Sequence, residues 1–291
     1  MKTFVLSTFV RKYTQRQMYI HNMLLFASSI AISLLYSKWV DVSNSCLVSD
    51  KLPTDKPIVV FGAGAGYWAY YLGVAKFMQD TYDMDNMNFL GVSAGTISCF
   101  GLVNKIPIDT VFDVCIEHLR LLNQHWTGLF GRWCLNCRRL SIQIMKDSGS
   151  QIAANRRLFS AVSQITPYGL RKKYLSGGDT YDDIVDATVT SYWIPFVTAP
   201  ILQPFRTIDG HWYVDGYLSG RDVVKKALFI YPTVFERLPL SVYWLWLERD
   251  YNIWLYNLGY EHARKHRHKL DAFFVGQPAP ELTAAQSSIP S

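Results

Sequence analysis

A serine set between two glycines is the feature of this sequence most suggestive of chemistry. Residues 91–95 read G-V-S-A-G, after a short apolar run and before a segment at 96–103 that can form a helix. A serine at such a tight strand-to-helix turn, a nucleophile elbow, is poised to attack a carbonyl, and small neighbours such as Gly91 and Gly95 let strand and helix approach closely. The pattern predicts Ser93 as a nucleophile. The alternative is an unreactive serine in a tight turn.

A serine nucleophile needs a base, and the sequence offers an aspartate. Asp215 follows a β-prone run at 212–214 and precedes Gly216, so we expect it at the end of a strand. Its ordinary pKa of about 3.9 makes it a poor base unless it contacts the serine directly in a desolvated pocket. Asp209 belongs to an Asp-Gly pair suited to a hairpin turn, and we assign it to that turn instead.

Histidine is the alternative base. His211 lies beside the aspartate, and His262, His266 and His268 follow Asp215 in the order that an ordinary α/β-hydrolase triad requires. The three late histidines belong to a charged run, which we interpret as a solvated face. We therefore favour a dyad of serine and aspartate without histidine.

A glycine-rich loop precedes the serine by about thirty residues. The loop follows an apolar, β-branched run at 57–61 and precedes a segment at 67–78 that can form a helix. Backbone amides at a helix N-terminus favour an anion or a developing oxyanion. We therefore predict that this loop forms an oxyanion hole, with Gly62, Gly64, Ala65 and Gly66 as its members.

The same loop also satisfies the G-x-G-x-x-A pattern of dinucleotide-binding sites, through Gly64, Gly66 and Ala69. In such a site an acidic residue closes the next strand, which we expect at 87–90. The acidic residues of this region all come before that strand: Asp80, Asp83 and Asp85. This order counts against a dinucleotide site.

Composition and charge limit the class of protein. Of 291 residues, 49% are hydrophobic and 18% are charged, which excludes a wholly disordered or collagen-like chain. The net charge of +6 is concentrated at the ends: residues 1–40 hold five Lys or Arg and no acid, and residues 262–269 add four more. The remainder is slightly acidic. This distribution favours contact with an anionic membrane over nucleic acid, for which no DNA-reading motif is found.

An uncharged stretch near the N-terminus has the length of a membrane span. Residues 17–37 lack formal charge and would extend about 31 Å as a helix. We expect a membrane anchor, with a cleaved signal peptide and a soluble amphipathic helix as alternatives. The preceding basic residues place the N-terminus in the cytoplasm, whereas the odd cysteine count and the lack of an N-x-Ser/Thr acceptor favour a cytosolic body. The side of the membrane is therefore undecided.

Two further patterns allow more than one interpretation. Apolar and aromatic residues recur at helical spacing over 240–258, which indicates either a second membrane-facing helix or a helix packed on the core. Among the five cysteines, Cys134 and Cys137 form a C-x-x-C pair without a second pair or a histidine companion nearby. We expect buried, reduced thiols there and no metal, a zinc site being the alternative.

The order of these motifs resembles the patatin-like phospholipase family. That family combines a glycine-rich oxyanion loop, a G-x-S-x-G elbow and an Asp-Gly loop, and residues 183–187, Ser191 and Ile194-Pro195 are similar to its helix and turn before the Asp-Gly strand. The likeness covers about residues 57–220. It implies a three-layer α/β/α sandwich that hydrolyses lipid or phospholipid esters with a Ser-Asp dyad, through an acyl-enzyme and without a metal or organic cofactor.

The chain departs from the family's usual pattern in three places. Ala69 stands where the glycine loop ordinarily has a further glycine, and Trp68 adds bulk beside that loop. Tyr217 follows Gly216, where glycine or alanine is common. These changes affect substrate fit more than the nucleophile or the base. A catalytically inactive lipid-binding protein and a transacylase of the same fold are therefore the alternative functions.

The predicted organisation follows from these patterns. We expect an α/β fold with an N-terminal hydrophobic helix and a C-terminal helical extension. The expected segments are a basic segment at 1–16, a hydrophobic membrane-anchor helix at 17–38, a linker at 39–56, a catalytic domain at 57–230, an aromatic and basic helical extension at 231–275 and a disordered tail at 276–291. The expected partners are a lipid or phospholipid substrate and a membrane surface, with no nucleic acid and no obligatory protein partner.

Overall fold

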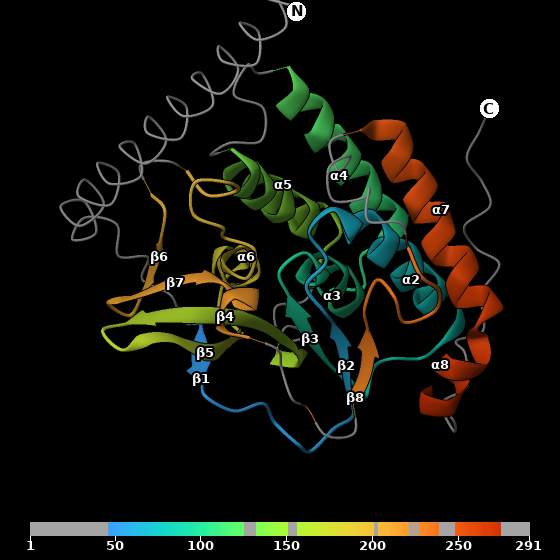
Figure 1. Ribbon diagram of the computed structural model, residues 1–291, viewed down its shortest axis with the longest axis horizontal. Coiled ribbons are helices and arrows are strands. Elements are labelled where there is room, and N and C mark those ends of the chain that lie inside the picture. Colours follow the sequence, from blue (N-terminus) through green and yellow to red (C-terminus); the bar gives the residue numbers. More distant parts are fainter. Residues whose placement is uncertain are drawn as a thin grey trace, which may run out of the picture.

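The computed structural model describes residues 46–124, 132–150, 156–200, 203–220, 224, 227–238 and 248–274. These residues form an α/β fold with a mixed eight-stranded sheet flanked by helices, so the predicted fold class is confirmed (Figure 1). The main path of the sheet has the order β1-β5-β4-β3-β2-β8, and β7 and β6 extend it beside β4. The strands are β1 (Leu47–Ser49), β2 (Ile58–Phe61), β3 (Asn88–Val92), β4 (Leu158–Thr166), β5 (Gly169–Ser176), β6 (Arg206–Ile208), β7 (His211–Asp215) and β8 (Ala227–Ile230).

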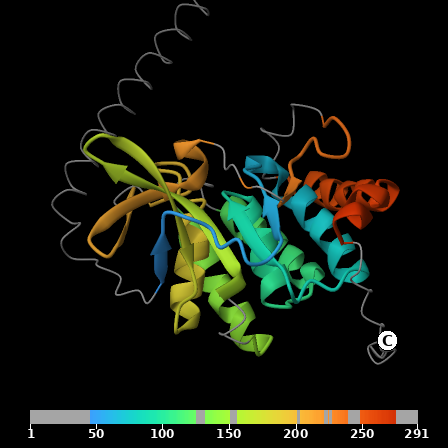
Figure 2. The same cartoon turned by 90° about the horizontal axis from the view of Figure 1, so that it is seen from below.

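The helices bury their apolar sides in one large core that includes Val59 and Phe61 of β2 and Phe89 of β3. Figure 1 shows α2, α4 and α7 side by side, and Figure 2 shows α7 and α8 at the opposite end from the β4–β5 and β6–β7 hairpins. The helical elements are η1 (Ala65–Tyr67), α2 (Trp68–Thr81), α3 (Gly95–Val103), α4 (Ile108–Asn123), α5 (Trp133–Asp147), α6 (Tyr181–Thr190), η3 (Gly216–Ser219), α7 (Arg249–Lys265) and α8 (Arg267–Phe274). The finer expectation of a three-layer sandwich stays a prediction.

The centre of the sheet brings two loops together. β2 and β3 are buried along their full lengths and pair in parallel, with Phe61 opposite Gly91. The carboxyl ends of parallel strands lie at the same edge of a sheet. The glycine-rich loop after β2 therefore emerges beside Ser93, which follows β3.

A change of partner along β4 explains how two residues 122 positions apart in the chain meet. On β4, Ala161 lies opposite Val92, the residue before Ser93, where β3 runs parallel to it. The next residue, Val162, lies opposite Asp215, the last residue of the antiparallel strand β7. β3 and β7 therefore run toward each other along the same edge of β4 and end at the same point.

Helices α2 and α7 approach each other through glycine. A Cβ atom added to Gly73 of α2 would lie 1.9 Å from the carbonyl oxygen of Tyr256. One added to Gly259 of α7 would lie 2.1 Å from the carbonyl oxygen of Tyr70. The backbones are thus too close for any side chain at either position. The pattern at 240–258 allowed two interpretations, and the structure describes it from residue 248. This described part forms a helix that packs on the core.

The expectation of a solvated face for the late histidines is wrong for His262. This side chain is only 9% exposed, and its Nδ1 atom lies 3.2 Å from the hydroxyl of Tyr70. Its Nε2 atom lies 3.6 Å from Glu236. Desolvation lowers the pKa of His262 below its usual value. The cause of the burial is the close packing of α7 on α2, which turns this residue inward.

Among the described residues, no helix is long and apolar enough to cross a membrane. The predicted basic segment at 1–16, the anchor at 17–38 and the tail at 276–291 lie outside those residues.

Replacing Gly259 by alanine should destabilise the protein by about 1–3 kcal/mol, because the added methyl group must push α7 away from the Tyr70 carbonyl. Thermal and urea unfolding measure the change. Asn257→Ala, on the exposed side of the same helix, is the matched control and should change the free energy of unfolding by no more than about 0.5 kcal/mol. Equal stability of the two variants would contradict the close packing of the helices.

Candidate active site

Ser93 occupies the turn between β3 and α3 in a strained backbone conformation. Its φ angle is +53°, in the left-handed region that residues other than glycine rarely adopt. A Cβ atom on Gly91 would lie 2.3 Å from the Cα atom of Thr96. One on Gly95 would lie 2.3 Å from the carbonyl oxygen of Phe61. Both glycines of the motif are thus required by close approach, which is the geometry of a nucleophile elbow.

The hydroxyl of Ser93 donates a hydrogen bond to the carboxylate of Asp215, with 2.6 Å between Oγ and Oδ2. Both side chains are almost enclosed, since Ser93 is 6% exposed and Asp215 is 2% exposed. The other carboxylate oxygen, Oδ1, accepts from the backbone amide of Tyr217 at 2.7 Å. Direct contact with the serine away from solvent is the condition under which an aspartate can act as its base.

Burial raises the pKa of Asp215 to about 6. The hydrogen bonds from Ser93 and from the Tyr217 amide act in the opposite direction, as does the positive charge of Lys172. The carboxylate is therefore largely ionised at neutral pH, yet it is a stronger base than an exposed aspartate.

The loop after Asp215 is fixed by the neighbouring strands. Lys172 of β5 donates to the carbonyl oxygens of Gly216 and Gly220 at 2.8 and 2.6 Å. Ser163 of β4 donates to the carbonyl oxygen of Asp215 at 2.7 Å. A Cβ atom on Gly216 would lie 2.1 Å from a carbonyl oxygen of β4, so the Asp-Gly motif is needed for this close fit. These contacts keep the carboxylate directed toward the serine.

Ser191 links the turn that carries Ser93 to the loop that follows Asp215. Its Oγ atom accepts hydrogen bonds from the backbone amide of Ser93 at 3.0 Å and from Thr96 Oγ1 at 2.9 Å. The same hydroxyl donates to the carbonyl oxygen of Ala161 at 2.7 Å. The carbonyl oxygen of Ser191 accepts from the amide of Gly216 at 3.1 Å. One residue thus supports the strained turn, a central strand and the Asp-Gly loop.

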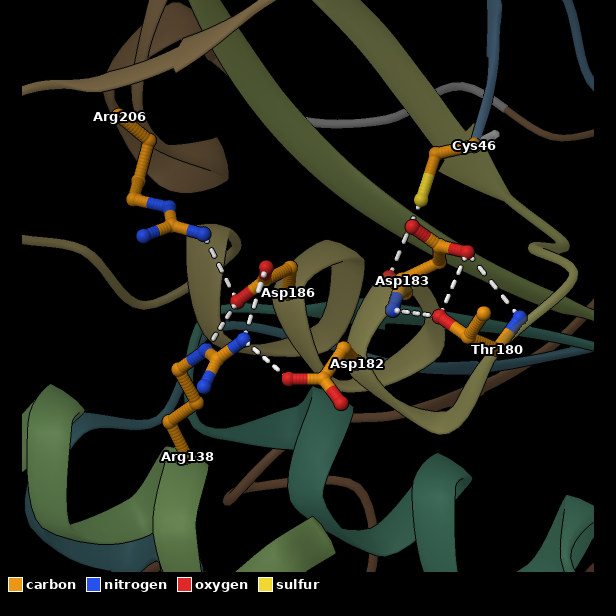
Figure 3. A network of polar contacts seen from close by, with 7 residues as sticks. All are labelled: Cys46, Arg138, Thr180, Asp182, Asp183, Asp186 and Arg206. Carbon is orange, nitrogen blue, oxygen red and sulfur yellow. Dashed lines mark hydrogen bonds and ion pairs between the residues drawn. The ribbon is translucent and has the colours of Figure 1, made fainter. Parts of the chain in front are cut away.

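Helix α6, which leads into this serine, is held by buried charges (Figure 3). Asp186 is fully buried, and its Oδ1 atom lies 2.7 Å from both Arg138 Nε and Arg206 Nη2. The helix begins with a capping box between Thr180 and Asp183, which satisfies two amides at its N-terminus. The ion pairs tie the helix to α5 and β6, and the capping box fixes its first turn.

The glycine-rich loop lies beside the elbow, but the backbone amide of one predicted member is already hydrogen-bonded to another strand. The amide of Gly62 donates to the carbonyl oxygen of Ile230 in β8 at 3.0 Å, so Gly62 is excluded as an oxyanion donor. Gly64 caps η1, and Ala65 has a φ angle of +44°. Amides at the start of a helical turn lack intrahelical acceptors. Gly64, Ala65 and Gly66 therefore stay the candidate donors.

The remaining acidic and histidine candidates do not join the dyad. Asp209 and Gly210 form the turn between β6 and β7 with φ angles of +50° and +71°, as predicted. His211 is exposed and pairs with Ile208 across that turn. Within the described parts of the chain, the hydrogen bonds made by the side chains of Ser93 and Asp215 involve no histidine.

The C-x-x-C cysteines lie on α5 as buried free thiols. The Sγ atom of Cys137 lies 3.2 Å from Nδ1 of His118, and burial raises the pKa of the Cys137 thiol well above its usual value. A neutral thiol is a poor metal ligand and a poor nucleophile. In the part of the chain that the structure describes, no group of three or more His, Cys, Asp or Glu side chains could hold a metal ion.

Comparison with known proteins shows a distant similarity to a human protein. No family model matches the chain. The curated human protein "1-acylglycerol-3-phosphate O-acyltransferase PNPLA3" is 26% identical to it over 170 residues. The alignment covers 54% of this chain and 33% of that protein, so this chain matches a third of its length. PNPLA3 is a patatin-like phospholipase domain protein, and the similarity gives weak support to the resemblance seen in the motifs.

Replacing Ser191 by alanine should slow the reaction of Ser93 with a fluorophosphonate probe by about tenfold to a hundredfold, because the strained turn loses its side-chain acceptor. The groups that bind the hydroxyl would also be left unpaired, so the free energy of unfolding should fall by about 1–3 kcal/mol. Labelling rates followed by intact mass and urea unfolding measure the two effects.

Ser98→Ala is the matched control. Ser98 lies on α3 behind the elbow and is fully buried, and its Oγ atom has no hydrogen-bond partner among the described residues. Its loss should leave the labelling rate within about twofold of the parent. A Ser191→Ala variant that reacts as fast as this control would rule out the positioning role.

Proposed function

We propose that this chain is a serine-dependent lipid acyl hydrolase of the phospholipase or acylglycerol lipase type. Ser93 is the nucleophile and Asp215 is the general base. The observation that carries the proposal is the 2.6 Å hydrogen bond between Ser93 Oγ and a carboxylate oxygen of Asp215, with both side chains buried. A serine in an ordinary βα turn has no need of a desolvated carboxylate, which is costly to bury.

The reaction follows from the geometry of the dyad. Asp215 takes the proton of the Ser93 hydroxyl as the oxygen attacks the ester carbonyl. The tetrahedral intermediate collapses, the ester C–O bond breaks, and the protonated Asp215 returns the proton to the leaving alcohol. Asp215 then deprotonates a water molecule that attacks the acyl-enzyme. As the second tetrahedral intermediate collapses, the bond between the acyl carbon and Ser93 Oγ breaks, Asp215 returns the proton to Ser93 Oγ, and the fatty acid is released. The proton thus cycles between Asp215 and the reacting oxygens in both half-reactions.

The developing negative charge needs donors beside the serine. The glycine-rich loop emerges next to the elbow because β2 and β3 are adjacent parallel strands. The amides of Gly64, Ala65 and Gly66 are the candidates for this role, since that of Gly62 binds β8. Ala65 holds a positive φ angle of +44°, a conformation that residues other than glycine rarely adopt.

The proposal that the substrate is a lipid rests on the distant relative. The name of that human protein describes O-acyl transfer involving an acylglycerol phosphate, a reaction of carboxylic esters of a lipid. A transacylase is therefore the second candidate function for this chain, since an acyl-enzyme can pass its acyl group to a lipid hydroxyl instead of water. A lipid-binding protein without activity is the third. Membrane association stays part of the proposal.

A fluorophosphonate probe should label the full chain on Ser93, with the adduct placed by peptide mapping. Ser93→Ala should abolish labelling, because the nucleophilic oxygen is absent. Asp215→Asn should slow it by about a hundredfold or more, because an amide cannot take the proton. Thr96 and Ser191 lie close to the same turn, so an adduct on either of them would contradict the assignment of the nucleophile. A folded parent that resists the probe would favour the lipid-binding alternative.

The activity on a soluble ester should rise with pH through about 6, because Asp215 must be ionised to accept the serine proton. Lys172→Met removes a positive charge that lowers this pKa, so the acid limb of the kcat/KM profile should move to higher pH. Lys172→Arg keeps the charge and should keep the parent profile. Identical profiles for all three chains would contradict an effect of the Lys172 charge on the pKa of Asp215.

A further inference from the structure

Four exposed apolar side chains gather on two neighbouring elements. Tyr168 and Leu170, at the β4–β5 hairpin, are 100% and 46% exposed, and Tyr217 and Leu218 of η3 are 58% and 49% exposed. Within the described residues, the other exposed large apolar side chains lie singly on separate elements: Leu47, Leu135 and Trp254. Single exposed apolar residues are common on protein surfaces, whereas grouped ones mark an interaction site. We call the group of four the docking patch.

The two elements of the docking patch are joined by hydrogen bonds. The ammonium group of Lys172 binds the carbonyl oxygens at both ends of η3. Leu170 lies two residues before Lys172 on β5, so both side chains leave the same face of the strand. Ser163, which pairs with Lys172 across the sheet, also binds Ser219 of η3 at 2.8 Å. These hydrogen bonds hold η3 against the hairpin, and Figure 2 shows the hairpin projecting at one end of the molecule.

This surface borders the dyad. Tyr217 comes two residues after Asp215, and its backbone amide binds the carboxylate. A substrate that lies on the exposed side of η3 is thus within a few residues of the proposed base. Tyr217 stands at a position where the sequence departs from the pattern of the family it resembles. Only its backbone amide contacts the dyad, so the exposed ring has no part in that contact.

The β4–β5 hairpin, which carries half of the docking patch, is positively charged. Residues 163–174 contain Arg171, Lys172 and Lys173 and no acid. Asp50 faces two of them, at 2.8 Å from Lys173 and 3.6 Å from Arg171. Arg171 and Asp50 are each more than half exposed, so their ion pair is weak and can exchange for another anion. Arg171 and Lys173 leave β5 on the face opposite to Leu170, because side chains alternate along a strand. A hairpin whose tip enters a bilayer interface would therefore place apolar side chains on one face and exchangeable cations on the other at the level of the headgroups, which is the composition that an anionic bilayer favours.

We propose that the docking patch is the surface through which this protein binds an anionic lipid bilayer. Tyr217 and Leu218 enter the boundary between headgroups and acyl chains, and Arg171 meets lipid phosphate or carboxylate. The proposal rests on the proposed function, because it supplies the lipid ester to the dyad from the bilayer. A protein partner on the same patch is the competing outcome.

A fluorophore attached at one position tests this locally. The native cysteines of the described residues are all buried, so Leu218→Cys in the full chain offers an exposed thiol for an environment-sensitive dye. Leu135→Cys, on α5 and exposed to a similar degree, is the matched control. Each chain is mixed with vesicles of phosphatidylcholine alone and of phosphatidylcholine with about 30 mol% phosphatidylserine. The readout reports this patch wherever else the chain attaches to lipid.

We expect a blue shift of the dye at position 218 on the phosphatidylserine vesicles and none at position 135. Adding Tyr168→Ser and Leu170→Ser to the labelled chain should reduce the shift by about half or more, because the hairpin loses its apolar contact. No shift on either vesicle, or an equal shift at both labelled positions, would overturn the proposal and leave the patch to a protein partner. An equal shift on neutral vesicles would overturn the assignment to anionic lipid.

Fluorophosphonate labelling of Ser93 in the same samples separates this proposal from the proposed function. Labelling without a shift at position 218 removes the docking patch and leaves the hydrolase. A shift without labelling keeps the docking patch and removes the hydrolase in favour of a lipid-binding protein. The hairpin substitutions should leave the labelling rate in the absence of vesicles within about twofold of the parent, since neither side chain touches the dyad.

Discussion

The carboxylate of Asp215 is buried against the hydroxyl of Ser93, and this contact imposes a requirement on the rest of the fold. Burial raises the pKa of this carboxyl from 3.8 to about 6, which corresponds to roughly 3 kcal/mol in favour of the protonated form. Because the folded pKa lies above the unfolded one, the stability contributed by this group is present at acid pH and is lost as the pH rises through about 6. A charged base at neutral pH is therefore held in place at a cost in stability.

The contacts that offset this cost come from elements far apart in the sequence. β3 and β7 end at the same point because β4 exchanges one partner for the other between Ala161 and Val162. Ser191 then binds both the nucleophile turn and the base loop, and the helix before it is fixed by the ion pairs of Asp186. Removing one partner from such a buried pair leaves an uncompensated charge and typically costs about 3–5 kcal/mol. The dyad geometry thus depends on a helix that does not touch the dyad.

Local patterns predicted the parts of the site that neighbouring residues create. The nucleophile turn, the hairpin at Asp209 and the strand that ends at Asp215 follow from turn chemistry and short-range periodicity. The contacts of Ser191 and Lys172 span 98 and 44 residues, and no local pattern encodes them. The burial of His262 was missed for the same reason, since a basic run gives no sign that two glycines bring α7 onto α2. The strand β8 accepts a hydrogen bond from an amide of the glycine-rich loop, and its pairing with β2 is also a long-range contact.

The fate of the acyl group in the proposed reaction is decided beside the dyad and not within it. Once an acyl-enzyme has formed on Ser93, the same carboxylate can deprotonate either water or a lipid hydroxyl, and the same amides stabilise either intermediate. The two reactions therefore compete through the local concentrations of the two acceptors. Tyr217 and Leu218 give the border of the site an exposed apolar surface immediately after the base. A bilayer bound there would exclude water and concentrate lipid hydroxyls near Asp215. If both proposals hold, substitutions in η3 and the hairpin should change the ratio of hydrolysis to transacylation more than the total turnover, because the dyad serves both reactions equally.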